Sequence, residues 1–176
     1  MRKSAILTPW RRVGIVALVV ALQATLIGAV MIAVLKAASS GTGLAQQESK
    51  STLVASFFIG AWVVAMNLVV ITGWLIAVMR MFALKTELLF AFDIAACTAI
   101  PLAAASLVLT PAVLTNGVKG LQESTWGMAA VIAGLVLMAA LGLILIVRQL
   151  GTHWVRSALI VLVWLGLPLA SAIFLG

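Results

Sequence analysis

Asp93 is the residue of this chain whose position most needs a chemical explanation. It lies in the apolar stretch LLFAFDIAACTAIPLAA, residues 88–104, of a chain with only four acidic residues. In a helix that starts at Leu88, a rise of about 1.5 Å per residue places Asp93 roughly 8 Å inside a membrane, and a short carboxylate does not reach water easily from there. We therefore expect Asp93 to be neutral, locally hydrated or paired with a cation.

Three arginines end neighbouring apolar runs on the same side as Asp93, and their long side chains can bend inward. These candidate partners are Arg80, Arg148 and Arg156, with His153 as a further candidate. Asp93 could form an ion pair that fixes the order of the helices, or it could be a transport site for a proton, a cation or a substrate amine. We favour the ion pair, because a single membrane-embedded carboxylate makes a poor proton relay.

Other reactive groups are too few for the usual membrane enzymes. Asp93 is the only aspartate, so a shared-proton aspartyl dyad is excluded. The only histidine, His153, falls in an expected turn, away from any nucleophile or second ligand. The single cysteine, Cys97, excludes an intrachain disulfide. We expect no enzyme activity, no cofactor and no metal site.

The composition is that of an integral membrane protein. The 176 residues are 65% hydrophobic and 9% charged, with a mean hydropathy of +1.29. Several apolar runs reach the ~20 residues that cross a bilayer. We predict an all-α, polytopic bundle of five transmembrane helices in a single membrane domain, 1–176, with spans at 13–35, 53–79, 88–110, 126–147 and 157–175.

Local signals set the ends of these spans. The first run is longer than the ~7–15 apolar residues of a secretory signal, so we read it as a retained helix. Pro111 is expected to stop the third run, and Ser124 or Thr125 to cap the start of the fourth. Pro101 and Pro168 should kink their helices, with Thr98 partly satisfying the backbone that Pro101 leaves unpaired.

The basic residues predict an orientation. Of the 11 Lys and Arg residues, eight fall on the side of the N-terminus if the runs alternate across the membrane, and three fall on the other side. The positive-inside rule then gives a cytoplasmic N-terminus and an outside C-terminus. The net charge of +7 is better explained by this asymmetry and by contact with anionic lipids at the cytoplasmic face than by a nucleic-acid partner.

Small and polar residues indicate how the helices pack. Stripes of small residues at four-residue spacing allow close helix contacts, either within the bundle or with a partner subunit. They are Ala17, Ala21, Thr25, Ala29 and Ala33 in the first run, Ala91, Ala95, Ala99 and Ala103 in the third, and Ala130, Gly134 and Gly142 in the fourth. Gln23 and Asn67, near the centres of runs one and two, could hydrogen-bond to each other, and we prefer this structural role to a substrate contact.

Three passages give the chain a resemblance to a known family. LTPWRR before the first span, AFDIAACTAIPLAAA in the third and the turn VRQLGTHWVRSAL before the last resemble the Yip1-type family of five-helix membrane proteins, in its short bacterial form. The resemblance implies a cytosolic N-terminus, a location in the bacterial cytoplasmic membrane and an accessory or organising role. The glycine pair and the aromatic residue that usually precede the third-span proline are missing.

Three functional hypotheses follow. The first is a non-enzymatic accessory or organising subunit of a membrane assembly, bound to other membrane proteins or to itself. The second is a small-solute transporter or substrate-binding membrane subunit that uses Asp93 and neighbouring polar residues, for which a deep cavity lined by Asn67, Asp93 and Trp residues would be expected. The third is a proton- or ion-conducting element based on Asp93.

Overall fold

The described part of the chain is entirely helical apart from its short connections. A computed structural model describes residues 6–40, 50–117 and 124–175. Within these ranges the helices are α1 (Pro9–Ser40), α2 (Lys50–Met81), α3 (Leu88–Asn116), α5 (Thr125–Leu150) and α6 (Trp154–Leu175). Each predicted span lies inside one of these helices, so the all-α fold class is confirmed.

Four of the helices are long and apolar enough to cross a membrane: α1, α2, α3 and α5. α6 has 22 residues, about 33 Å at 1.5 Å per residue, and its side chains are described as far as Pro168. The chain is therefore a helical bundle of the membrane type. The fifth crossing remains a prediction.

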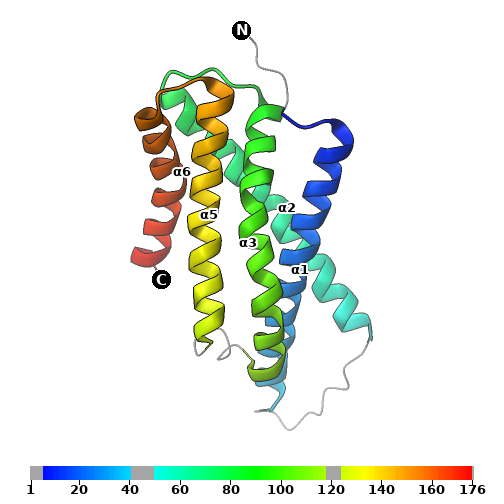
Figure 1. Ribbon diagram of the computed structural model, residues 1–176. Coiled ribbons are helices and arrows are strands. Elements are labelled where there is room, and N and C mark those ends of the chain that lie inside the picture. Colours follow the sequence, from blue (N-terminus) through cyan, green and yellow to red (C-terminus); the bar gives the residue numbers. More distant parts are fainter. Residues whose placement is uncertain (1–5, 41–49, 118–123, 176) are drawn as a thin grey trace.

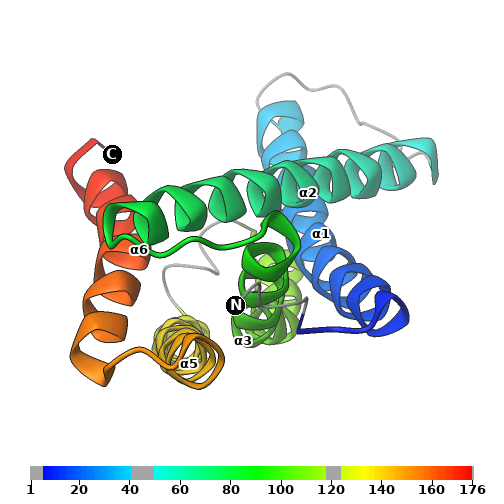
Figure 2. The ribbon, with the colours of Figure 1, turned by 90° about the horizontal axis from the view of Figure 1, so that it is seen from above.

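Successive helices run in opposite directions, and α3 lies at the centre of the bundle (Figure 1). α3 packs against α1, α2 and α5, while α6 packs against α5 and the C-terminal part of α2. α2 crosses the others obliquely (Figure 2). The start of α1, the segment 80–88 and the segment 148–156 meet at one end of the molecule. We call it the basic end, because it holds Arg11, Arg12, Arg80, Lys85, Arg148 and Arg156.

The alanine stripe of α3 and the glycines of α5 pack inside the bundle. Ala91, Ala95, Ala99 and Ala103 are all buried. A Cβ at Gly134 would lie 3.3 Å from the Pro101 carbonyl oxygen, and one at Gly142 would lie 3.3 Å from the Trp164 ring. Small residues thus let α3, α5 and α6 approach closely, as close packing in lipid requires.

The small-residue stripe of α1 is divided between two environments. Ala29 is buried near the crossing with α2, where a Cβ at Gly60 would lie only 2.8 Å from the Ala24 carbonyl oxygen. Toward the basic end α1 and α2 diverge, and Ala17, Ala21 and Thr25 are exposed. We call these three residues the outer stripe of α1.

The helix termini correct one prediction and confirm another. Pro111 does not end the third helix, which continues to Asn116. A proline removes only one backbone hydrogen bond, and in this segment the hydroxyls of Thr110 and Thr115 donate to the carbonyls of Ser106 and Pro111. The predicted N-cap of α5 is confirmed, because the Ser124 hydroxyl accepts a hydrogen bond from the Gly127 N–H at 3.0 Å.

The other two helix prolines lie where they were expected, Pro101 inside α3 and Pro168 inside α6. Both helices continue past them, so the kinks themselves stay predictions. The expected role of Thr98 is wrong in detail. Its hydroxyl donates to the carbonyls of Ile94 and Ala95, at 2.8 and 3.0 Å, and not to the Cys97 carbonyl that Pro101 leaves without a backbone donor.

Candidate functional site

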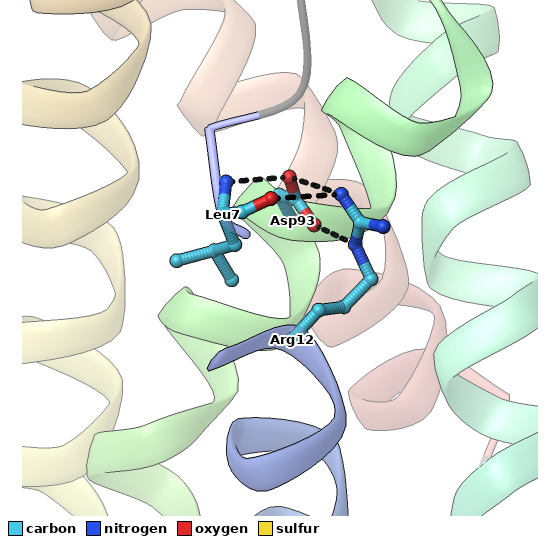
Figure 3. Close-up of polar contacts among 3 residues, drawn as sticks. All are labelled: Leu7, Arg12 and Asp93. Carbon is cyan, nitrogen blue, oxygen red and sulfur yellow. Dashed lines mark hydrogen bonds and ion pairs between the residues drawn. The ribbon is translucent and has the colours of Figure 1, made fainter. Parts of the chain in front are cut away.

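Asp93 is part of a compact ion pair, and its partner is Arg12 (Figure 3). Nε of Arg12 lies 2.5 Å from Oδ1 of Asp93, and Nη2 donates to Oδ2 at 3.1 Å. Arg12 comes from the first turn of α1 and Asp93 from the second turn of α3, and the two helices start at the same end of the bundle. The Asp93 side chain is 0% exposed and that of Arg12 is 17% exposed. This two-bond geometry fixes the relative position of the two helices.

The segment that precedes α1 completes the site. The backbone N–H of Leu7 donates to Oδ2 of Asp93 at 3.0 Å, and Nη2 of Arg12 donates to the Leu7 carbonyl at 3.2 Å. Ile6 packs against the apolar core formed by α2, α3, α5 and α6. Both carboxylate oxygens are therefore bonded, and the N-terminal segment is tied across the basic end of α3.

The predicted partners of Asp93 were wrong. Arg80, Arg148 and Arg156 are exposed at the basic end, and Arg156 instead donates a hydrogen bond to the Phe82 carbonyl. His153 is also exposed and lies beside the Trp154 ring. The reason is the packing order: α3 turns the Asp93 face toward α1, whereas α6, which carries Arg156, packs against α5 and α2.

A sequence signal for Arg12 was available. Arg12 begins the first apolar run from the same side on which Asp93 enters the third. The long Arg12 side chain can therefore extend to the depth of the Asp93 carboxylate. What the sequence does not reveal is which face of α3 lies against α1, and this decides between Arg12 and the three arginines at the other helix ends.

Gln23 and Asn67 are brought together around a cavity, but they do not form the predicted pair. No hydrogen bond joins their carboxamides in the part of the chain that the structure describes. Both line a cavity of about 320 Å³ between α1, α2, α3 and α5, with Ser106 as a third polar residue. Neither Asp93 nor any Trp residue lines it. The cavity is thus separate from the ion pair.

Two partly buried tryptophan hydrogen bonds, which the sequence did not indicate, join α2 to α6. The indole N–H of Trp74 donates to the Trp164 carbonyl at 3.1 Å, and that of Trp164 donates to the Ile71 carbonyl at 3.3 Å. In both cases a side chain satisfies a backbone carbonyl of the other helix. The contact positions α6 against the oblique helix α2.

The described residues contain no group of three or more His, Cys, Asp and Glu side chains that could hold a metal ion. Cys97 is half-buried in α3 as a free thiol.

Comparisons of the chain with known protein families, with curated proteins and with solved structures find no match. The Yip1-type resemblance therefore stays a prediction.

Proposed function

We propose that the chain is a non-enzymatic integral membrane protein that acts as an accessory or organising subunit of a membrane assembly. The observation that supports this most is the outer stripe of α1. Ala17, Ala21 and Thr25 are exposed, whereas the corresponding stripe of α3 is buried by neighbouring helices. The described helices of the chain leave the outer stripe open to a further helix.

The physical argument rests on how helices associate in lipid. Because lipid tails are as apolar as leucine side chains, helices gain little from burying large residues against each other. Small residues allow the backbones to approach and gain dispersion contacts instead. An exposed small-residue stripe on a membrane helix is therefore a suitable surface for a partner helix, from another subunit or from a second copy of the chain.

The bonding of Asp93 supports a structural role for the charge pair. Arg12 and the Leu7 N–H occupy both carboxylate oxygens, and the side chain is fully enclosed. A carboxylate held in this way has no oxygen directed at a passing solute. We accordingly assign it to the order of the helices rather than to conduction.

The same proposal includes a location and an orientation. We place the chain in the bacterial cytoplasmic membrane with five crossings, the basic end on the cytoplasmic side and the C-terminus outside. The clustering of basic residues at one end agrees with the positive-inside rule. Anionic lipid head groups would contact the exposed arginines there.

Small-solute binding is a second candidate function. The cavity between α1, α2, α3 and α5 supports it, since this space carries polar groups at the level of the mid-helix. It would use Gln23 and Asn67 in place of Asp93. The Arg12–Asp93 pair would then remain a structural element in both candidate functions.

Site-specific photocrosslinking in native membranes tests the accessory role. Benzoylphenylalanine at Leu18, exposed beside the outer stripe, should give an intermolecular adduct. The same probe at Val136, which is also exposed but lies on α5, should give none. Adding Ala21→Leu to the Leu18 probe should remove the adduct, because a larger side chain keeps the backbones apart. Equal adducts from both positions, or none from Leu18, would reject the assignment.

A further inference from the structure

The cavity between α1, α2, α3 and α5 has the size and lining of a small-molecule site. Its volume, about 320 Å³, lies near the lower end of the ~300–1,000 Å³ typical of ligand pockets. Most of its lining is apolar, and its polar side chains are Gln23, Asn67 and Ser106. No charged residue lines it. An apolar pocket with a few convergent polar groups is the usual form of a site for a lipophilic ligand.

The two carboxamides are in an unusual position for membrane helices. Gln23 lies near the middle of α1 (Pro9–Ser40) and Asn67 near the middle of α2 (Lys50–Met81). Neither makes a side-chain hydrogen bond within the described residues, although hydrocarbon offers no replacement partner. Each carboxamide has two N–H donors and a carbonyl acceptor. A molecule that entered the cavity with its own polar group would satisfy them.

The position of the carboxamides restricts the class of occupant. A charged group is costly at this depth, and the cavity supplies no countercharge. Phospholipid head groups stay in the interfacial region outside the hydrocarbon, so they do not reach the middle of α1 and α2. A whole helix is about 10 Å wide with its side chains, which suits an open face better than a cavity formed by four helices.

We propose that this cavity binds a neutral lipophile whose hydrogen-bonding head group, a carbonyl or a hydroxyl, is held by Gln23 and Asn67. The apolar lining from α3 and α5 receives the rest of the molecule, as at Leu102, Leu109 and Met138. This inference rests on the second candidate function and names its ligand class. It does not involve the outer stripe of α1.

Binding of decylubiquinone tests the proposal. This neutral molecule is a quinone ring with two carbonyl groups, and the ring bears a ten-carbon alkyl chain. The full chain, purified in detergent, is titrated with the probe and the bound fraction is read by native mass spectrometry. We expect one molecule per chain. Gln23→Leu and Asn67→Leu should each weaken binding about three- to tenfold, the effect of losing one hydrogen bond. Ala105→Phe, which fills the cavity, should abolish binding.

Matched controls separate hydrogen bonding from simple partition into an apolar space. Decylbenzene has a similar shape without carbonyl groups and should bind at least tenfold more weakly. Decanol, a hydroxyl probe, distinguishes the two kinds of head group. Thr25→Val removes a polar group of α1 outside the cavity and should leave binding unchanged, as should Ala21→Leu. Helical circular dichroism and a monodisperse elution profile confirm that each variant is folded.

Three results would overturn the proposal. The first is that neither decylubiquinone nor decanol binds. The second is that decylbenzene binds as tightly as decylubiquinone. The third is that folded Gln23→Leu and Asn67→Leu bind decylubiquinone with the affinity of the parent chain. A protein partner that co-purifies and whose crosslinks map to Gln23 and Asn67 would also overturn it, because a helix would then occupy the cavity. The Leu18 crosslinking result is independent of all of these, so failure of the ligand site and failure of the accessory role can be told apart.

Discussion

Arg12 and Asp93 leave water together when the bundle forms, and each is costly to bury without the other. Replacing Arg12 with Ala leaves the enclosed Asp93 carboxylate without a cation. We expect this variant to lose about 3–5 kcal/mol of unfolding free energy, measured by SDS titration in mixed micelles. Arg11→Ala is the matched control, since Arg11 is exposed, and should change stability by less than about 0.5 kcal/mol.

Asp93→Asn should cost less than Arg12→Ala. Arg12 is partly exposed, so a guanidinium that has lost its partner can turn toward water. The double substitution Arg12→Met with Asp93→Leu should recover most of the loss in the same titration, because an apolar pair of similar volume avoids the desolvation of two charges. A double variant less stable than Arg12→Ala would show that the pair does more than hold α1 to α3.

At the scale of single residues, the sequence predicted what kind of interaction Asp93 makes but not with which residue. The depth of Asp93 in an apolar run favoured pairing with a cation over the neutral and the locally hydrated carboxyl. The choice among Arg12, Arg80, Arg148 and Arg156 depended on which helix packs against which face of α3, and this is set by the sum of many apolar contacts. The same limit explains why Gln23 and Asn67 face one cavity at the expected depth without bonding to each other.

Among the helices, the crossing of α1 and α2 depends on a glycine. Gly60→Ala would place a Cβ 2.8 Å from the Ala24 carbonyl oxygen, a backbone atom that cannot move alone. We expect a loss of about 1–3 kcal/mol from overpacking. Gly73→Ala is the control on the same helix, because no atom lies within 4 Å of the new methyl, and it should gain up to about 1 kcal/mol of helix propensity. Equal effects of the two substitutions in SDS titration would contradict the observed crossing.

The contact between α2 and α6 gives a second prediction at this scale. Trp74→Phe removes one hydrogen bond to a backbone carbonyl and should cost about 1 kcal/mol. Trp164→Phe should cost more, since Trp164 is 1% exposed and the smaller ring leaves unfilled space as well. Trp126→Phe, at an exposed position, should have little effect. If Trp164→Phe behaved like Trp126→Phe in thermal unfolding, α6 would not be held to α2 by this contact.

The helices themselves were predictable, because each contains a run of apolar residues whose length and composition alone indicate a membrane helix. Their ends were less so: Pro111 suggested a stop five residues before Asn116, since a proline in an apolar helix is tolerated where hydroxyls support the neighbouring carbonyls. Whether a small-residue stripe faces inward or outward was also beyond the sequence. Ala21 and Ala95 have the same side chain, yet Ala21 is exposed and Ala95 is buried.

For the molecule as a whole, the proposed orientation can be read from two cysteines. In a Cys97→Ser background, Lys36→Cys at the far end of α1 should react with a membrane-impermeant maleimide in intact cells. Lys85→Cys at the basic end should react only after permeabilisation. The reverse pattern would overturn the positive-inside assignment, and equal labelling of both would argue against alternate crossing of the membrane.

We propose that this protein acts by binding a partner at the outer stripe of α1 and not by chemistry at its buried charge pair. The most direct measurement is the adduct yield of the Leu18 photocrosslinker in native membranes for three chains: the parent, Ala21→Leu, and the Arg12→Met with Asp93→Leu double variant. We predict that the adduct is lost in Ala21→Leu and retained in the Arg12→Met with Asp93→Leu double variant. An adduct that persists in Ala21→Leu and is absent from the folded double variant would contradict a partner site at the outer stripe of α1.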